Sequence, residues 1–248
     1  MTHNIISKLM NAAAGLGSRN QTNAMEKNTM TPTTLPIGRR GMLALAVAGL
    51  SLPALFAQPA RAENTESTAV IAPIQRLNDA LLANMKAGKQ VPFAQRFAAL
   101  APVIENAFDL DAILAASVGL RWRSMAENEK AALQAAFRRY TVSSYLANFD
   151  EYNGQSFQIA PSVRKLDNGE AVVDTKILRK DGTSTKLSYV MRKTPSGWKA
   201  VDVLLDGTIS RVAVQRSDFR YLLTNGGVPA LVAGLQNKVA NLSGGMRA

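Results

Sequence analysis

The chain has 248 residues, of which 47% are hydrophobic, and its 29 basic and 18 acidic side chains give a net charge of +11. It contains no cysteine, and its one histidine is His3. These counts exclude disulfides, thiolate nucleophiles and Cys-ligated metals from the whole chain, and exclude Ser-His-Asp triads and His-ligated zinc from every residue after His3. We therefore expect no metal and no cofactor.

The N-terminal region has the pattern of an export signal. Arg39 and Arg40 precede an uncharged run, residues 41–52, and small residues at Ala60-Arg61-Ala62 follow as a peptidase site. The run is too short to cross about 30 Å of hydrocarbon as a helix, which disfavours a membrane anchor. The sequence predicts that residues 1–62 are removed near Ala62 and that residues 63–248 function outside the cytoplasm. The paired arginines fit the twin-arginine route, and an ordinary Sec signal fits about equally.

The positive charge divides between these two parts. Of the net +11, residues 1–62 carry +5 and residues 63–248 carry +6. A balance of this size suits solubility and contact with anionic lipid headgroups. Because no block of basic residues is interleaved with aromatics, we expect no binding of nucleic acid.

Helical periodicity opens the predicted mature chain. Apolar residues recur at three- and four-residue spacing over residues 71–85, which predicts an amphipathic helix that ends before Gly88. Pro92 marks the start of a second helix, and Pro102 is expected to interrupt it. Both helices would place one apolar face against a core.

Two further helices carry capping signals. Asp109 is a suitable N-cap for a third helix, which Gly119 would close in a left-handed conformation. Ser124 and Glu127 form a potential capping box for a longer helix that runs to about Phe149.

The period then changes from helical to extended. Alternation places Leu187, Tyr189 and Met191 on one face of a strand, with polar residues between them. Short turns such as Asn168-Gly169 imply antiparallel pairing. The predicted strands are residues 155–160, 171–180, 184–193 and 198–205.

Two final helices are predicted at residues 216–224 and 228–242, separated by Gly226-Gly227. Helices, an antiparallel meander and further helices make an α+β layer arrangement, with the helices packed on one face of a curved sheet of four to five strands. No linker divides residues 63–248, so we expect a single domain.

A set of landmarks is spread over residues 70–240: Gly119, Trp122, Arg123, Phe137, Tyr145, Tyr152, Gly154, Gly197-Trp198-Lys199, Asp202, Gly207, Ser210, Arg216, Ser217 and Phe219. In their order and spacing these residues resemble the MlaC-type periplasmic lipid-shuttle family, also called the toluene-tolerance or ABC-transporter auxiliary family. The run from Asp206 to Phe219 looks most like its hopanoid-biosynthesis-associated HpnM branch.

The resemblance implies a carrier whose helices and sheet enclose an apolar cavity for a lipid. It also implies an inner-membrane lipid transporter and an outer-membrane lipoprotein complex as partners, with transient membrane contact. Val201 and Val214-Gln215 depart from the pattern of the phospholipid branch. These departures favour a hopanoid over a phospholipid as the cargo.

Nine apolar residues are our candidates for the cavity wall, and a lipid needs a cavity of at least several hundred Å³. Apolar faces of sheets are normally filled by the helices above them, so we expect about half of these residues to contact cargo. The candidates are Ile113, Phe137, Ile177, Leu187, Tyr189, Met191, Val203, Leu205 and Ile209.

Charged residues leave other interpretations open. We expect Asp202 to pair with Arg123 or Arg216, since a lone buried charge is costly. An enzyme could draw its acid and base from Asp174, Asp202 and Tyr189, and a non-transporting scaffold of lipid assembly is a third possibility. Basic residues around the Asp181-Gly182 turn are either a solvated strand face or a docking surface for anionic headgroups: Arg179, Lys180, Lys186, Arg192 and Lys193.

Overall fold

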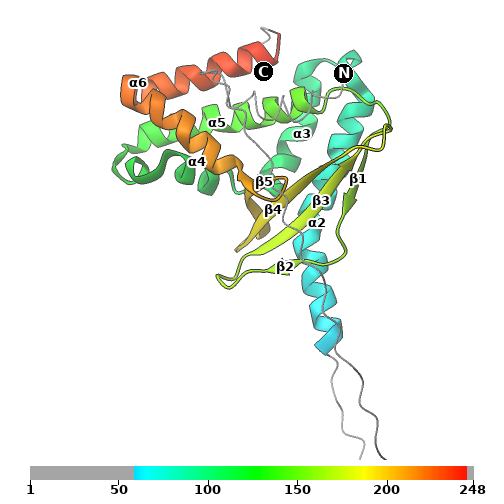
Figure 1. Ribbon diagram of the computed structural model, residues 1–248. Helices are drawn as coiled ribbons and strands as arrows, with labels where there is room; N and C mark the ends of the chain where they lie inside the picture. Colours follow the sequence, from blue (N-terminus) through cyan, green and yellow to red (C-terminus); the bar gives the residue numbers. More distant parts are fainter. Residues whose placement is uncertain (1–58, 245–248) are drawn as a thin grey trace, which may run out of the picture.

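The computed structural model describes residues 59–244, in which α-helices pack on one face of an antiparallel sheet (Figure 1). The predicted α+β class is confirmed. The Arg39-Arg40 pair and the apolar run of the predicted export signal lie outside the described residues. No helix within residues 59–244 has the length and apolarity needed to cross a membrane.

The N-terminal helices run longer than predicted. The first, α2 (Pro59–Ala87), is followed by a 3-10 turn, η1 (Gly88–Gln90), and by α3 (Phe93–Ala107). The expected interruption at Pro102 is wrong, because α3 continues through it. Proline costs this helix one backbone hydrogen bond, but Leu100 and Ile104 are buried on the same face and hold it against the core.

The caps of the next helices are partly as predicted. Asp109 accepts a hydrogen bond from the Ala112 N–H at 3.1 Å, and α4 (Leu110–Val118) ends at Gly119 with φ of 75°. A 3-10 segment, η2 (Gly119–Ser124), then leads to α5 (Glu127–Asn148). The predicted Ser124–Glu127 capping box is wrong: the Ala126 N–H donates to Glu129 Oε2 at 3.0 Å, so the capping carboxylate lies two residues further on.

The sheet has the strand order β1-β3-β4-β5-β6, with β2 paired to β3 on a side branch. All pairs are antiparallel, and the four predicted strands appear with ends shifted by a few residues. Two strands of two residues each, too short for a periodic signal, bring the sheet to six strands within residues 59–244. The strands are β1 (Ser156–Ile159), β2 (Arg164–Lys165), β3 (Ala171–Leu178), β4 (Ser184–Thr194), β5 (Gly197–Leu205) and β6 (Ile209–Ser210).

Strand register decides which side chains reach the core. Tyr189 on β4 lies opposite Val173 on β3 and Val203 on β5, and this face is turned towards the helices. Neighbouring Ser188 lies opposite Asp174 on the other face. Helix α2 runs along the core face and contacts β1, β3 and β5 (Figure 1).

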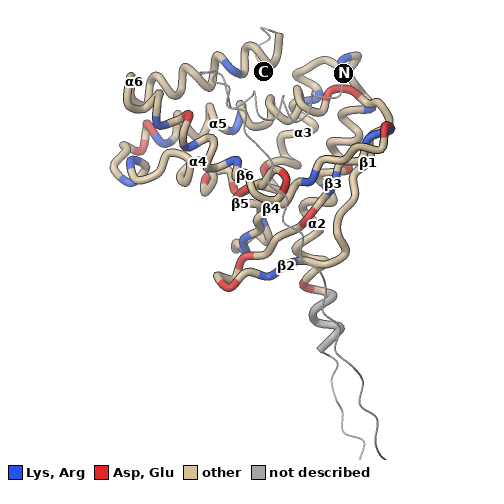
Figure 2. The backbone as a smooth tube through the Cα atoms, viewed as in Figure 1, with Lys and Arg blue, Asp and Glu red and all other residues tan. Residues whose placement is uncertain are grey.

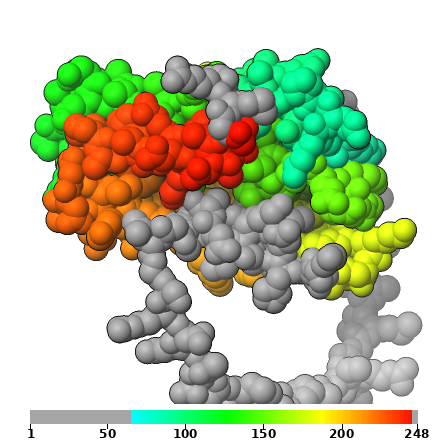
Figure 3. Space-filling view, turned by 90° about the horizontal axis from the view of Figure 1, so that it is seen from above, coloured from blue at the N-terminus to red at the C-terminus, as the bar shows by residue number. Residues whose placement is uncertain are grey.

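The last helix, α6 (Arg211–Leu242), is one segment with a sharp break at Gly227, where φ is 65° and ψ is −159°. Residues 211–226 form its N-terminal arm and residues 228–242 its C-terminal arm. The predicted division at Gly226-Gly227 is correct, and the first arm begins five residues before the predicted start. Helix α6 packs against α5, and the orange and red residues of its two arms lie side by side in Figure 3. The arms are so close at Gly234 that an added Cβ would meet Leu222 Cδ1 at 3.1 Å.

Candidate functional site

A cavity of about 180 Å³ lies between α4, α5, the end of β5 and the N-terminal arm of α6. Its wall is largely apolar and is built by six elements and the loops between them. The lining residues are Phe108, Leu110, Ile113, Phe137, Tyr140, Thr141, Ser144, Tyr145, Asn148, Phe149, Leu187, Asp202, Val203, Leu205, Ile209, Arg211, Val212, Val214 and Gln215.

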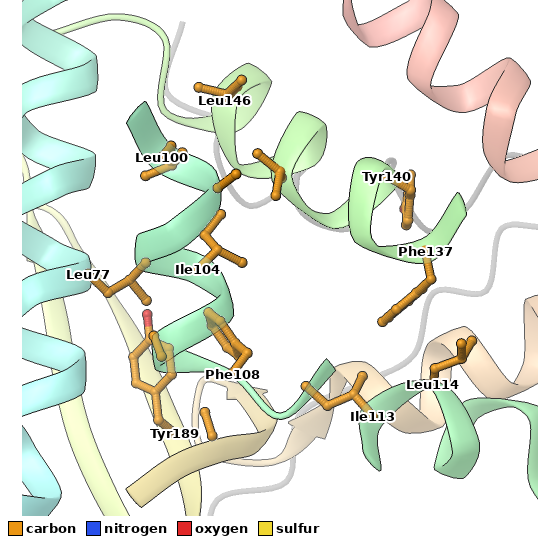
Figure 4. Packing of buried hydrophobic residues seen from close by; sticks show 14 of the residues in the cluster. Leu77, Leu100, Ile104, Phe108, Ile113, Leu114, Phe137, Tyr140, Leu146 and Tyr189 are labelled. Carbon is orange, nitrogen blue, oxygen red and sulfur yellow. The ribbon is translucent and has the colours of Figure 1, made fainter. Parts of the chain in front are cut away.

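Aromatic side chains in contact with one another form part of this wall. Phe108, Ile113 and Phe137 point towards one another from three different segments (Figure 4). The ring of Phe108 lies 5.5 Å from that of Tyr145, and Phe137 meets Phe219 edge-on at 6.2 Å. Contacts of this kind fix ring positions, so the hollow is bounded by side chains that cannot easily collapse into it.

The cavity is smaller than the several hundred Å³ expected from the sequence. An engineered apolar cavity of about 150 Å³ accommodates one benzene molecule. The space of about 180 Å³ therefore admits one ring or a short run of methylenes, and a whole lipid needs the walls to move apart or part of its length to remain outside.

Six of the nine candidate residues lie on the cavity wall: Ile113, Phe137, Leu187, Val203, Leu205 and Ile209. The other three do not line it. Ile177 and Met191 have no exposed surface and belong to the packed core. Tyr189 lies one layer behind the wall, with its ring 6.2 Å from that of Phe108. Alternation along the strands predicted the correct face, but not which stretch of that face lies under the cavity.

Helix α5 contributes a stripe of side chains that the candidate set omits. Tyr140, Ser144 and Asn148 are spaced four residues apart and face the cavity, with Thr141 and Tyr145 beside them. This spacing is visible in the sequence as one face of a helix. Its members are mainly polar, so a prediction from apolar positions does not include them.

The hydroxyl groups on this stripe of α5 are buried. Burial raises the pKa of Tyr140 and of Tyr145 above the usual range of a phenol, so both hydroxyls stay neutral. The Thr141 hydroxyl is buried and makes no hydrogen bond in the structure. A buried hydroxyl without a partner is costly, and a polar group on a bound molecule would supply the missing bond.

Asp202 is not paired with Arg123 or Arg216, contrary to expectation. Its carboxylate accepts hydrogen bonds from the Ser210 hydroxyl, the Val203 N–H at 2.7 Å and the Val212 N–H at 3.1 Å. The guanidinium of Arg216 lies instead against Gly119. Asp202 therefore ties β5 to the first turn of α6, where a carboxylate complements the helix N-terminus.

The three residues that an enzyme could use are not brought together. Asp174 lies on the outer face of the sheet and Tyr189 on the core face, while Asp202 is held in the cap of α6. Burial alone would raise the pKa of Asp174, but hydrogen bonds from Arg164 at 2.9 Å and from Ser188 outweigh it and lower the pKa to about 2. This carboxylate is charged at neutral pH, where it forms ion pairs with Arg164 and Lys186.

The basic residues near the Asp181-Gly182 turn are partly neutralised. Arg192 pairs with Glu170 at 2.7 Å, and Lys186 lies 3.4 Å from Asp174. Figure 2 shows acidic and basic residues interspersed along these strands. These ion pairs are typical of a solvated strand face, and the docking surface for anionic headgroups stays a prediction.

Among residues 59–244, no three His, Cys, Asp or Glu side chains are grouped so that they could hold a metal ion. The fold and the cavity thus define an α+β domain with an apolar pocket between its helices and one end of its sheet.

Comparison with known proteins identifies the family of this chain. Residues 75–237, more than half of the chain, match the MlaC protein family, and the chain belongs to that family. Its fold is shared by a phospholipid-binding protein from Ralstonia solanacearum whose structure was solved in complex with a phospholipid. The two chains are 21% identical with a TM-score of 0.60, and the match covers 70% of this chain and 98% of the other.

Proposed function

We propose that this protein is a periplasmic carrier that holds one lipid in the cavity under α5 and α6 and moves it between membrane complexes. The observation that carries the proposal is a largely apolar cavity of about 180 Å³ in a chain of the MlaC family. The Ralstonia solanacearum protein of the same fold was solved with a phospholipid, which supports a lipid as the guest.

Free energy explains why a lipid needs such a carrier. Each methylene exposed to water costs about 0.8 kcal/mol, so one acyl chain or hopanoid skeleton costs on the order of 10 kcal/mol to bring into the aqueous phase. Burial among Phe108, Ile113 and Phe137 offsets part of that cost. This function requires no acid, base or metal, in accord with a site in which Asp174 and Tyr189 lie on opposite faces of the sheet.

The volume of the cavity constrains how the lipid is held. A space of about 180 Å³ takes only a segment of an acyl chain or one part of a ring system. The break at Gly227 leaves the two arms of α6 as separate rigid pieces that could shift relative to α5. We propose that the arms move apart when a lipid enters, and that the headgroup remains at the edge of the cavity.

Two lipids are candidates for the cargo. The departures from the phospholipid branch at Val214 and Gln215 support a hopanoid, because both residues line the cavity and so would alter its selectivity. The phospholipid bound to the Ralstonia solanacearum protein supports a phospholipid.

The proposed function also includes a location in the periplasm and two membrane partners. Export by the signal in residues 1–62 would place the protein in the periplasm. There it would exchange lipid with an inner-membrane lipid transporter and an outer-membrane lipoprotein complex, through transient membrane contact. Sequencing the N-terminus of protein isolated from the periplasmic fraction tests the location, and a chain that keeps residues 1–62 in the cytoplasm contradicts it.

Native mass spectrometry of the protein purified from its own host tests the function. A carrier should carry about one lipid per chain, and the mass of that lipid identifies a hopanoid or a phospholipid. An enzyme or a scaffold of lipid assembly should be free of stoichiometric lipid, and that result would contradict the proposal.

A further inference from the structure

A second hollow adjoins the cavity near the junction of α3 and α4. It is an open groove of about 330 Å³ between the end of α3, the start of α4, α5 and β5. Three side chains line both the groove and the cavity: Phe108, Leu110 and Phe137. These three side chains therefore form a partition between the two spaces.

The groove and the cavity differ in the chemistry of their walls. The cavity wall is largely apolar, whereas the groove is lined by five charged side chains of both signs, namely Glu105, Asp109, Asp111, Arg138 and Lys199. Ala135 and Arg138 are exposed, so the groove is open to solvent. A lipid has the same division into an apolar part and a polar end. A lipid that crossed the partition would therefore have each part in matching surroundings.

Hydrogen bonds between different elements join the walls of the groove. Arg138 Nε on α5 donates to Glu105 Oε1 on α3 at 2.6 Å, and Gln134 Nε2 on α5 donates to Asp111 Oδ1 on α4 at 2.9 Å. Lys199 Nζ on β5 donates to the Glu105 carbonyl oxygen at 2.8 Å. With the helices and the strand joined in this way, a passage between the groove and the cavity depends on the side chains of the partition.

Within the partition, Leu110 is the side chain best placed to move. The ring of Phe108 lies 5.5 Å from that of Tyr145, and the ring of Phe137 meets that of Phe219 edge-on, so both phenylalanines are held by aromatic neighbours. Phe108 and Phe137 point towards one another in Figure 4. Leu110 is aliphatic and only half-buried at the first residue of α4, where a change of rotamer is fast. Such a change would open the partition between the two rings.

We propose that a bound lipid passes beside Leu110, so that its apolar part occupies the cavity and its polar end lies in the groove between α3 and α5. Leu110 is the gate of this passage. The inference rests on the proposed function, and it identifies the edge of the cavity at which the polar end remains. Because the groove is open and has charges of both signs, it suits a headgroup that is too large and too polar for the cavity itself.

A side chain that fills the groove tests where the polar end lies. Ala135 lines the groove but not the cavity, so Ala135→Trp adds bulk to the groove alone. Phosphatidylglycerol and diacylglycerol with the same acyl chains should be compared on the full-length protein by displacement of a fluorescent lipid. Ala135→Trp should weaken phosphatidylglycerol binding about tenfold and diacylglycerol binding less than about twofold, because only the first has a large polar end. Retained diacylglycerol binding also shows that the variant is folded.

Ala132→Trp is the matched control, since Ala132 is an exposed alanine of α5 that lines neither the groove nor the cavity. It should bind both lipids as the unmodified protein does. The position of the polar end is wrong if Ala135→Trp leaves phosphatidylglycerol binding unchanged, if it weakens both lipids equally, or if the control loses as much. Binding of neither lipid by the unmodified protein excludes a glycerolipid cargo, and that form of the proposed function falls together with this inference.

Transfer rates test the gate. Leu110→Ala should raise both the association and the dissociation rate of a short-chain phosphatidylglycerol about tenfold in stopped-flow fluorescence, because a smaller gate lowers the barrier in both directions. Leu205→Ala is the matched comparison, since Leu205 lines the cavity but not the groove, and it should raise the dissociation rate only. If Leu110→Ala also raises the dissociation rate alone, Leu110 is a contact of the bound lipid and the gate is overturned.

Discussion

The two ends of the helical layer are built from the same kinds of residue and differ in what fills them. Between α2, α3 and the sheet, Ile74, Leu77, Leu81 and Ile104 have no exposed surface and pack against one another. We call this region the filled half. Between α4, α5, α6 and β5, side chains of similar size leave a cavity of about 180 Å³, and we call this the hollow half. The difference indicates that the filled half stabilises the fold, while the hollow half gives up packing in order to bind a guest.

The largest expected effect on stability is in the filled half. Leu77→Ala should lower the free energy of unfolding by about 3 kcal/mol, through lost burial and a new void, as for Leu→Ala changes in rigid cores. Denaturant unfolding measures this loss. Leu205→Ala in the hollow half is the matched comparison, and it should cost clearly less because Leu205 already borders a space. Equal losses would mean that the two halves do not differ as described.

A substitution in the hollow half should change lipid binding strongly and the free energy of unfolding only slightly. Ile113→Trp adds volume to a side chain that points into the hollow (Figure 4) and should weaken lipid binding on the order of a hundredfold. Its effect on the free energy of unfolding should stay below about 1.5 kcal/mol, since the added atoms enter existing space. Unchanged lipid content per folded chain in native mass spectra would show that the lipid lies elsewhere.

A smaller effect concerns the junction between the two halves. Asp202→Ala removes the acceptor for the Ser210 hydroxyl and the Val212 N–H, and should lower the free energy of unfolding by about 1 to 2 kcal/mol. Asp202→Asn keeps one acceptor oxygen and should lose less. The order of the thermal midpoints of the three proteins gives the measurement, and an alanine variant as stable as the parent would contradict the capping role.

The smallest expected effect on the free energy of unfolding concerns Asp174, on the outer face of the sheet, and it depends on pH. The folded-state pKa of Asp174 is lowered to about 2, so its contribution to stability is present above an unfolded-state pKa of about 4 and is lost as the pH falls towards 2. After allowance for solvent screening, Asp174→Asn should cost about 1 kcal/mol at pH 7 and nothing at pH 2. Asp167→Asn, which removes the same charge at an exposed position, is the matched control for the change in net charge. Lipid binding should be unchanged in both variants, because the sheet separates Asp174 from the hollow half.

Much of the fold follows from local patterns that the sequence displays. The caps at Asp109 and Gly119, the alternation through Tyr189 and the division at Gly226-Gly227 all appear at their predicted places, because each depends on a few neighbouring residues. The continuation of α3 through Pro102 was not predictable in this way. It depends on burial of one helix face, which is a property of the assembled core.

The sequence predicts only some of the residues that line the cavity. Period-two alternation identifies the core face of β4 and β5. On that face of β4, Leu187 lines the cavity and Met191 is packed in the core, and only the assembled fold decides between the two. Arg211 was missed for a related reason. A single arginine at the start of a helix has no periodic signal, and its place beside Tyr140 follows from how α6 packs on α5.

An experimental structure of the protein with its co-purified lipid tests the central claim most directly. The account predicts apolar density between Phe108, Ile113 and Phe137, with the polar end of the lipid at the edge of the cavity and the arms of α6 further from α5. A lipid bound on another surface, or a hollow half closed by its own side chains in the lipid-loaded protein, would contradict it.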